Sequence, residues 1–328
     1  MAKIKKQEPK AKSSKKSKKK SKKGYKVRNW SEYNEMLVNR GRLDVWVEES
    51  VLENWFAPPT GKRGAQPRYT DKAVELTLQF GQVFGQKLRQ TEGLVKSLFD
   101  LMLIDRPVPD HSTLSRRAET LTVKLPKEEK GVLTIIADSS GLKVYGEGEW
   151  KVRKHGYSKH RTWRKVHLAV TPEVEIRAEE LTENSCADEK VLPQLIEAET
   201  ANIDKLAGDG AYDRSSVYQL CQEREIKTIA IPPQKNAKIW RHGNLKTPPH
   251  PRDGNLRAIR KSSRQVWKEQ IGYHVRSIGE NVFFRWKTTF GDKLNARKLA
   301  TQKTEARIKA VILNKMRLMG MPQSYIPS

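Results

Sequence analysis

Hydrophobic positions follow a helical period over the first part of the chain. From Thr70 onward apolar side chains recur at steps of three and four, which predicts a helix with Thr70 as its N-cap. Residues 91–103 repeat this pattern. The two predicted faces consist of Ala73, Val74, Thr77, Phe80, Phe84 and Leu88, and of Leu94, Val95, Leu98, Leu101 and Met102. Residues 25–125 are therefore predicted to be mainly helical.

The period changes at residue 131. The run "GVLTIIAD" is almost continuously apolar, which is typical of a strand buried on both faces, and it is predicted to end at Asp138. Residues 163–170 alternate, with Val166, Leu168 and Val170 pointing inward. Strand patterns at 176–181, 203–209 and 226–233 alternate with helical patterns at 188–200 and 215–225. This order predicts a mixed α/β fold.

Residues 273–287, "YHVRSIGENVFFRWK", fit an amphipathic helix. One face carries Val275, Ile278, Val282 and Trp286, and the other carries Tyr273, Arg276, Glu280 and Lys287. A solvated charged face is the usual explanation of such a row. A last helix, with Ile308, Val311, Ile312 and Met316, follows after it.

The charge narrows the class of partner. The 328 residues carry a formal net charge of +26, which indicates a polyanionic partner, either nucleic acid or an anionic membrane. No run of 18 apolar residues and no apolar stretch after the N-terminal lysines occur, so we expect neither a membrane span nor an ordinary secretion signal. Cys186 and Cys221 have no ligand spacing, which excludes a zinc finger and fits a reducing cytoplasm.

Part of this charge is concentrated in residues 1–24. Twelve lysines and one acidic residue occupy the first 23 positions, and such a segment is expected to be disordered. It could grip phosphates without sequence preference or act only as a solubility tail.

Two further segments are candidates for DNA contact. The segment "HSTLSRRAETL" follows a turn after a helix, so Arg116 and Arg117 could meet DNA in a helix-turn-helix arrangement, although an ordinary helical hairpin is equally compatible. Residues 150–167 interleave basic and aromatic side chains, which suits phosphate contact and base stacking; a basic hairpin loop is the plainer interpretation. The contacts expected there are Lys154, His155, Lys159, Arg161, Trp163, Arg164 and Lys165. We expect His155, His160 and His167 to contact phosphate or to be exposed rather than to bind metal.

Three acidic residues suggest catalysis. Asp138 and Asp209 are each predicted to lie where a strand ends, and Glu280 lies on a helix that could cross that edge of the sheet. Three carboxylates brought together cannot all stay ionised without cations. Two Mg²⁺ ions would neutralise them and serve an in-line phosphodiester displacement. Arg276 and Lys287 would then hold the DNA backbone beside the scissile phosphate, with Tyr273 nearby.

The residues that carry this hypothesis also carry a resemblance. The spacing Y-(2)-R-(3)-E-(6)-K, at Tyr273, Arg276, Glu280 and Lys287, resembles the C-terminal signature of bacterial insertion-sequence transposases of the DDE class. The blocks "ADSSGLKVYGEGEW", "KHGYSKHRTWRKVHLAV", "GDGAYD", "IPPQKNA", "PDHSTLSRR" and "LMGMPQSY" are most similar to the family numbered five among insertion sequences.

The resemblance covers roughly residues 30–325 and implies a ribonuclease H-like catalytic fold. It implies Asp138, Asp209 and Glu280 as ligands of two Mg²⁺ ions, for which Mn²⁺ can substitute. Its expected partners are double-stranded DNA, as terminal inverted repeats and target, and a second copy of the chain in a synaptic complex at the bacterial nucleoid. We divide the chain into a tail (1–24), a helical DNA-binding domain (25–127) and a catalytic domain (128–328).

Other classes remain open on the sequence alone. A non-catalytic DNA-binding regulator would explain the charge but not the three acids, and a nuclease of the same fold would cut without rejoining. A tyrosine recombinase is less favoured, because Tyr273 has Glu280 on its own face where phosphate-binding residues are needed. Gly279, directly before Glu280, costs a helix about 1 kcal/mol relative to alanine.

Overall fold

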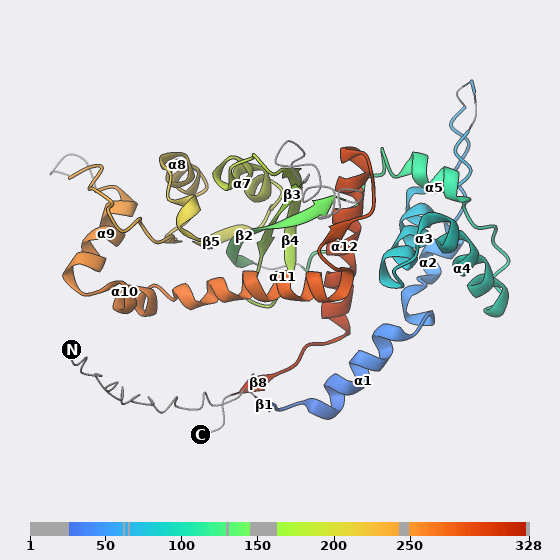
Figure 1. Cartoon of the computed structure of the whole chain (residues 1–328), viewed down its shortest axis with the longest axis horizontal. Helices are drawn as coiled ribbons and strands as arrows, with labels where there is room; N and C mark the ends of the chain where they lie inside the picture. The colour runs from blue at the N-terminus through green and yellow to red at the C-terminus, as the bar shows by residue number, and fades with distance from the viewer. Residues whose placement is uncertain are drawn as a thin grey trace, which may run out of the picture.

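The computed structural model describes residues 26–61, 63–64, 66–128, 131–144, 163–242 and 249–325 (Figure 1). The lysine-rich tail lies outside these residues. So do His160 and four of the expected DNA contacts, namely Lys154, His155, Lys159 and Arg161. No helix in the described ranges is long and apolar enough to cross a membrane.

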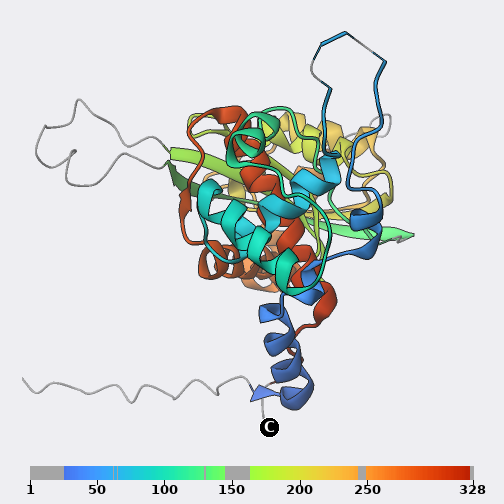
Figure 2. The ribbon, with the colours of Figure 1, turned by 90° about the vertical axis from the view of Figure 1, so that its right-hand side faces the viewer.

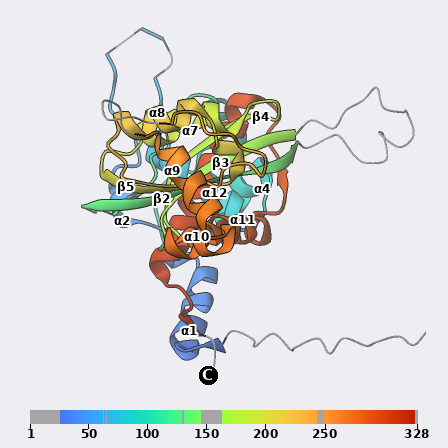
Figure 3. The same ribbon diagram turned by 90° about the vertical axis from the view of Figure 1, so that its left-hand side faces the viewer.

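Helices occupy the N-terminal part of the chain, as predicted. They are α1 (Trp30–Gly41), the 3₁₀ turn η1 (Asp44–Trp46), α2 (Glu49–Glu53), α3 (Asp71–Val83), α4 (Leu88–Leu101) and α5 (His111–Arg117). The Thr70 hydroxyl accepts a hydrogen bond from the N–H of Ala73, which confirms it as the N-cap of α3. All three views show α1 projecting from the body (Figures 1, 2 and 3).

Two details of these helices differ from the prediction. Leu88 begins α4 instead of extending α3, because Gly85 takes a positive φ of 65° and turns the chain between them. Leu101 is 82% exposed, whereas Phe99 is buried. The buried apolar face of α4 therefore follows Val95, Leu98 and Phe99 and does not include Leu101.

A mixed sheet forms the centre of the molecule and confirms the α/β class. Its strands follow the order β4-β3-β2-β5-β6, with β7 paired to the far end of β2. The central strand β2 is antiparallel to β3 and parallel to β5. The strands are β2 (Val132–Val144), β3 (Trp163–Val170), β4 (Ile176–Glu183), β5 (Asn202–Ala207), β6 (Thr228–Ala230) and β7 (Lys293–Leu294).

Strand β2 corrects one expectation. It does not end at Asp138 but continues for six more residues to Val144, because β3 pairs with it along this stretch, with Asp138 opposite Leu168. The parallel partner β5 ends earlier, at Ala207 opposite Ile136. Asp138 therefore lies in the middle of a strand, at the point where its neighbour on one side has ended.

Helices cover both faces of the sheet (Figure 1). One face packs against α7 (Asp188–Glu197) and α8 (Ser215–Glu223). The other packs against α11 (Ser277–Phe290) and α12 (Leu299–Met319). Val282 and Trp286 of α11 are buried, as the amphipathic pattern predicted, but residues Tyr273–Arg276 form a 3₁₀ turn, η3, ahead of the α-helix.

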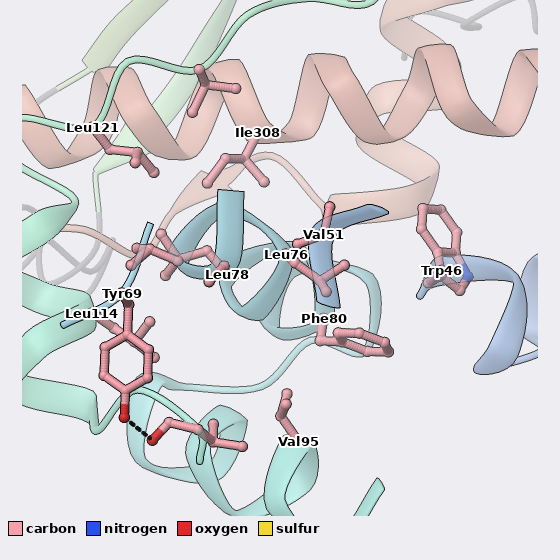
Figure 4. Packing of buried hydrophobic residues seen from close by; sticks show 14 of the residues in the cluster. Trp46, Val51, Tyr69, Leu76, Leu78, Phe80, Val95, Leu114, Leu121 and Ile308 are labelled. Carbon is pink, nitrogen blue, oxygen red and sulfur yellow. Dashed lines mark hydrogen bonds between the residues drawn. The ribbon is translucent and has the colours of Figure 1, made fainter. Parts of the chain in front are cut away.

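Helix α12 joins two hydrophobic clusters. Ala306, Ala310 and Leu313 pack on the sheet. Ile308, Val311, Ile312 and Met316 pack with α3 and its neighbours, and Figure 4 shows Ile308 beside the side chains of that cluster. In Figure 2 the N-terminal helices lie in front of α12. A two-stranded sheet of β1 (Lys26–Val27) and β8 (Ser324–Tyr325) further ties the described ends together.

The apolar pattern predicted no helix or strand in the segment between β6 and α11. It contains two helices instead, α9 (Pro251–Lys261) and α10 (Arg264–Gln270), which lie beyond the strands at one end of the molecule (Figure 1). The apolar pattern of α9 is weak, since its buried residues are Arg252, Asp253 and Leu256.

Candidate active site

Strand register places Asp138 beside Asp209. In the parallel pair of β2 and β5, Ile136 is opposite Ala207. Asp138 lies two residues after Ile136, and Asp209 lies two residues after Ala207. Asp209 leaves the strand and caps the 3₁₀ turn η2 (Gly210–Tyr212), where its carboxylate accepts a hydrogen bond of 2.8 Å from the N–H of Ala211. The two acids predicted at one edge of the sheet thus emerge side by side.

Glu280 is brought close to Asp138 by the packing of the preceding residue, Gly279. Gly279 is buried against β2, and a β-carbon at this position would lie 3.0 Å from Cβ and 3.1 Å from Oδ2 of Asp138. Helix α11 therefore crosses β2 at Asp138. Glu280 is in the first turn of that helix, with its side chain 61% exposed.

The charges at this edge act on one another. The pKa of Asp138 is raised to about 6, mainly by burial. The hydrogen bond from Ser139 and the charge of Arg276 oppose this shift, and the carboxylates of Asp209 and Glu280 add to it. Burial is also the main cause of the raised pKa of Tyr273, with contributions from the same three carboxylates. Asp138 and Tyr273 are therefore both close enough to the carboxylates of Asp209 and Glu280 to be influenced by their charge.

Arg276 supplies positive charge to this group. Its guanidinium forms an ion pair with the Glu280 carboxylate and lies 3.8 Å from Oδ1 of Asp138. The guanidinium thus bridges two of the three carboxylates. Asp138 also accepts a hydrogen bond of 3.0 Å from the N–H of Ser139.

The other residues of the row lie on either side. The Tyr273 ring lies 5.9 Å from the ring of Trp267, and the Lys268 ammonium lies 5.2 Å from its centroid. Lys287 is exposed nearly two turns beyond Glu280 on α11. All four residues of the sequence row therefore lie on η3 and α11, with Arg276 and Glu280 at the acidic edge.

The expected contacts on α5 differ from each other. Arg116 is exposed and donates to the Thr113 hydroxyl, at 3.4 Å. Arg117 instead pairs with Asp71 at 2.5 Å and donates to the carbonyl of Tyr69 at 2.9 Å. Arg117 therefore fastens α5 to the start of α3.

Three expected contacts begin β3. Trp163 packs across the sheet on Gly141, Arg164 donates to Gln302 at 2.9 Å, and Lys165 lies 3.3 Å from Asp188. Each is partly buried.

His167 corrects another expectation. It is fully buried, with Nε2 2.9 Å from the Thr182 hydroxyl and Nδ1 3.2 Å from Asp188, so it is neither exposed nor a phosphate contact. Its position in the alternating strand β3 opposite Ser139, on the α7 face, explains the burial.

The supporting roles of two glycines were not predicted from the sequence. The Tyr212 ring packs on Gly208, where a β-carbon would lie 2.8 Å from Cδ2 of the ring, so Gly208 permits the turn that carries Asp209. Gly279 plays the corresponding part for Glu280. The glycine directly before Asp209 and the glycine directly before Glu280 were the available sequence signal. Their role depends on the residues that pack against them, which no local sequence pattern identifies.

The donors at this edge suit a hard divalent cation by their chemistry. Carboxylate oxygens are the preferred ligands of Mg²⁺, and a bound cation would stabilise the ionised form of Asp138, which burial disfavours. In the described residues, however, no group of three or more His, Cys, Asp or Glu side chains is gathered closely enough to hold a metal. The Glu280 carboxylate is directed to Arg276. The residue types therefore fit, and the Glu280 side chain would have to turn.

Comparison with models of known families gives two matches. Two family models, each described as a transposase DDE domain, match residues 38–147 and 130–315. The second match covers more than half of the chain and contains Asp138, Asp209 and Glu280. The mixed α/β architecture is consistent with a ribonuclease H-like transposase domain. The chain therefore belongs to the DDE transposase family.

Proposed function

We propose that this transposase binds the terminal inverted repeats of a DNA element, hydrolyses the phosphodiester at the element's end and joins the freed 3′-hydroxyl to target DNA. The observation that carries the proposal is the convergence of Asp138, Asp209 and Glu280 at one sheet edge, through strand register and the contact of Gly279 with Asp138. We assign the chain to the insertion-sequence family numbered five because its blocks "GDGAYD", "IPPQKNA" and "PDHSTLSRR" are most similar to that family.

The three acids would hold two Mg²⁺ ions, or Mn²⁺ in their place. When bound, such ions activate the attacking oxygen and stabilise the leaving one. Asp138 would serve as the fixed ligand, since it is held by a central strand and by a hydrogen bond from Ser139. Glu280 would turn from Arg276, which frees that guanidinium for the scissile phosphate.

The remaining residues would position DNA. Lys287 and Tyr273 flank Glu280 and would contact the backbone on either side of the bond that breaks. Water supplies the first nucleophile, and the P–O bond to the 3′ oxygen of the element's end breaks. The released 3′-hydroxyl then attacks a phosphodiester of target DNA, and the 3′ oxygen of the target strand leaves. No covalent bond to protein forms. The helical N-terminal region, with exposed Arg116, would bind repeat DNA, and a second copy would bind the other end in the bacterial cytoplasm.

Asp138→Asn tests this proposal. Asparagine keeps the size of the side chain and removes its charge, so we expect end binding to persist while strand cleavage and joining in Mg²⁺ fall by at least about 10³-fold. The matched control is Asp204→Asn on β5, whose partly exposed carboxylate lies 3.3 Å from Lys227 and which should cleave normally. Undiminished cleavage by Asp138→Asn would refute the site.

The same assay separates the two alternatives. A regulator derived from a transposase would bind ends, and the unaltered protein would cut nothing. A nuclease would cut but give no joined product with target DNA. Cleavage followed by joining supports transposition.

A further inference from the structure

The chain between β6 and η3 forms a strongly basic extension, which we call the basic lobe (residues 232–242 and 249–270). It carries nine lysine or arginine residues and two acidic ones. One of the acids, Asp253, is fully buried. In Figure 1 its helices α9 and α10 lie at the end of the molecule opposite α3–α5, with the sheet between them.

Four arginines of the lobe hold it together. Their guanidinium groups each donate to a main-chain carbonyl of residues 233–242, over 2.7–3.0 Å: Arg252 to Lys238, Arg257 to His242, Arg260 to Ala237 and Arg264 to Pro233. Asp253 accepts from the N–H groups of Trp240 and Arg241. The 233–242 segment is therefore fixed on α9 and α10.

The lobe is also attached to the acidic edge at two points. Arg252 forms a buried bidentate pair with Asp213, at 2.7 and 3.1 Å, and Asp213 follows Asp209 by four residues. At the other end, Trp267 packs on Tyr273, which precedes Arg276 by three residues. The lobe thus has a set position relative to the carboxylates.

A second set of basic side chains does not take part in holding the lobe together. Lys235, Lys238 and Arg241 are exposed on the fixed segment, and none of their side chains forms an ion pair with an acid in the described ranges. Like charges held together on an ordered surface repel one another, so they favour a polyanion that neutralises them. A rigid row of cations beside a phosphodiester site matches the backbone of a duplex that passes through it.

We infer that the 233–242 segment of the basic lobe binds the phosphate backbone of the DNA next to the bond that is cut. This inference rests on the proposed function. Its contacts are to phosphate, so they add affinity without sequence preference. Arg252, Arg257, Arg260 and Arg264 hold the segment in place. Lys235, Lys238 and Arg241 bind the phosphates.

The test is a triple variant, Lys235→Gln/Lys238→Gln/Arg241→Gln. Its affinity for labelled duplex DNA of arbitrary sequence is measured by fluorescence anisotropy across a range of KCl concentrations. We expect the slope of log affinity against log salt to flatten by about 0.9 for each phosphate that the variant no longer neutralises, and affinity at low salt to fall by about tenfold or more. Thermal unfolding should not change, since the arginine scaffold remains.

Two controls isolate the effect. Lys190→Gln removes an exposed lysine from α7, on the other side of the sheet from α11, and should leave the slope unchanged. Lys235→Arg/Lys238→Arg keeps the charge and should retain binding. An unchanged slope in the triple variant overturns the inference about the lobe. If the unaltered protein neither binds nor cuts DNA, the proposed function itself fails, which is a different result.

Discussion

Gly279 and Asp138 pack against each other where α11 crosses β2, and a β-carbon on Gly279 would lie 3.0 Å from the β-carbon of Asp138. The glycine weakens the helix locally but allows the helix to approach the strand. Glu280 follows directly, so this close contact sets the distance between two of the three acids. The site therefore depends on a residue that has no chemistry of its own.

Gly279→Ala should disturb this approach. Alanine adds about 1 kcal/mol of helix propensity, but overpacking against a fixed strand costs about 1–3 kcal/mol. We expect a net loss of stability in urea unfolding, and a loss of DNA cleavage larger than the loss of DNA binding. The control is Gly93→Ala in α4, where no atom lies within 4 Å of the added β-carbon, so it should stabilise the protein. If both variants were equally stabilised, α11 would have room to move.

Asp138 should make stability depend on pH in the metal-free protein. Its pKa is raised from 3.8 to about 6, so the protonated form favours folding below pH 3.8, and this contribution is lost as pH rises through 6. Asp138→Asn does not titrate. As pH rises from 3.8 to 6, the free energy of unfolding of Asp138→Asn should therefore increase relative to that of the unaltered protein. The increase should be at most about 1.4 kcal/mol for each unit by which the pKa is raised, and the difference should stay constant above pH 6.

Urea unfolding of the two proteins across this pH range measures the difference. Saturating Mg²⁺ should shrink it, because a bound cation stabilises the ionised carboxylate. A difference that does not vary with pH would mean that Asp138 is not desolvated.

The apolar periods predicted most of the sheet and the buried face of α11, because burial of Val166, Leu168, Val282 and Trp286 needs no information beyond their spacing. The same patterns gave wrong predictions where contacts with distant parts of the chain determine strand length or burial. Strand β2 continues past Asp138 because β3 supplies its partner. Leu101 is exposed because α4 ends beyond the edge of its core.

Helix α9 was not predicted, for a related reason. Its apolar burial amounts to Leu256, and its other buried residues are Arg252 and Asp253. A helix held by a buried ion pair and by arginine-to-carbonyl hydrogen bonds has no hydrophobic stripe in its sequence. The three acids were proposed as a site from the sequence, whereas the ion pair between Arg276 and Glu280 was not, although a spacing of four residues on a helix allows it.

Arg252→Ala should unfold the lobe. Removing one partner of a buried pair leaves Asp213 charged and unpaired, at a cost of about 3–5 kcal/mol. Arg257→Ala removes a hydrogen bond at a partly exposed position and should cost no more than about 1.5 kcal/mol. Urea unfolding compares the two, and similar small losses would show that the pair with Asp213 contributes little.

Arg276→Gln should alter how the DNA-free protein binds metal. The guanidinium lies 3.8 Å from Asp138 and pairs with Glu280, so it opposes the approach of a second cation to these carboxylates. Its removal should raise Mg²⁺ affinity by about tenfold, which is about 1.4 kcal/mol of relieved repulsion. Isothermal titration calorimetry without DNA measures this change.

Arg276→Lys is the matched control, because it keeps the charge and should bind Mg²⁺ as weakly as the unaltered protein. Cleavage should nevertheless fall in Arg276→Gln, because the same guanidinium is then missing from the scissile phosphate. Weaker Mg²⁺ binding in Arg276→Gln would show that Arg276 holds the acids in place for the metal instead of competing with it.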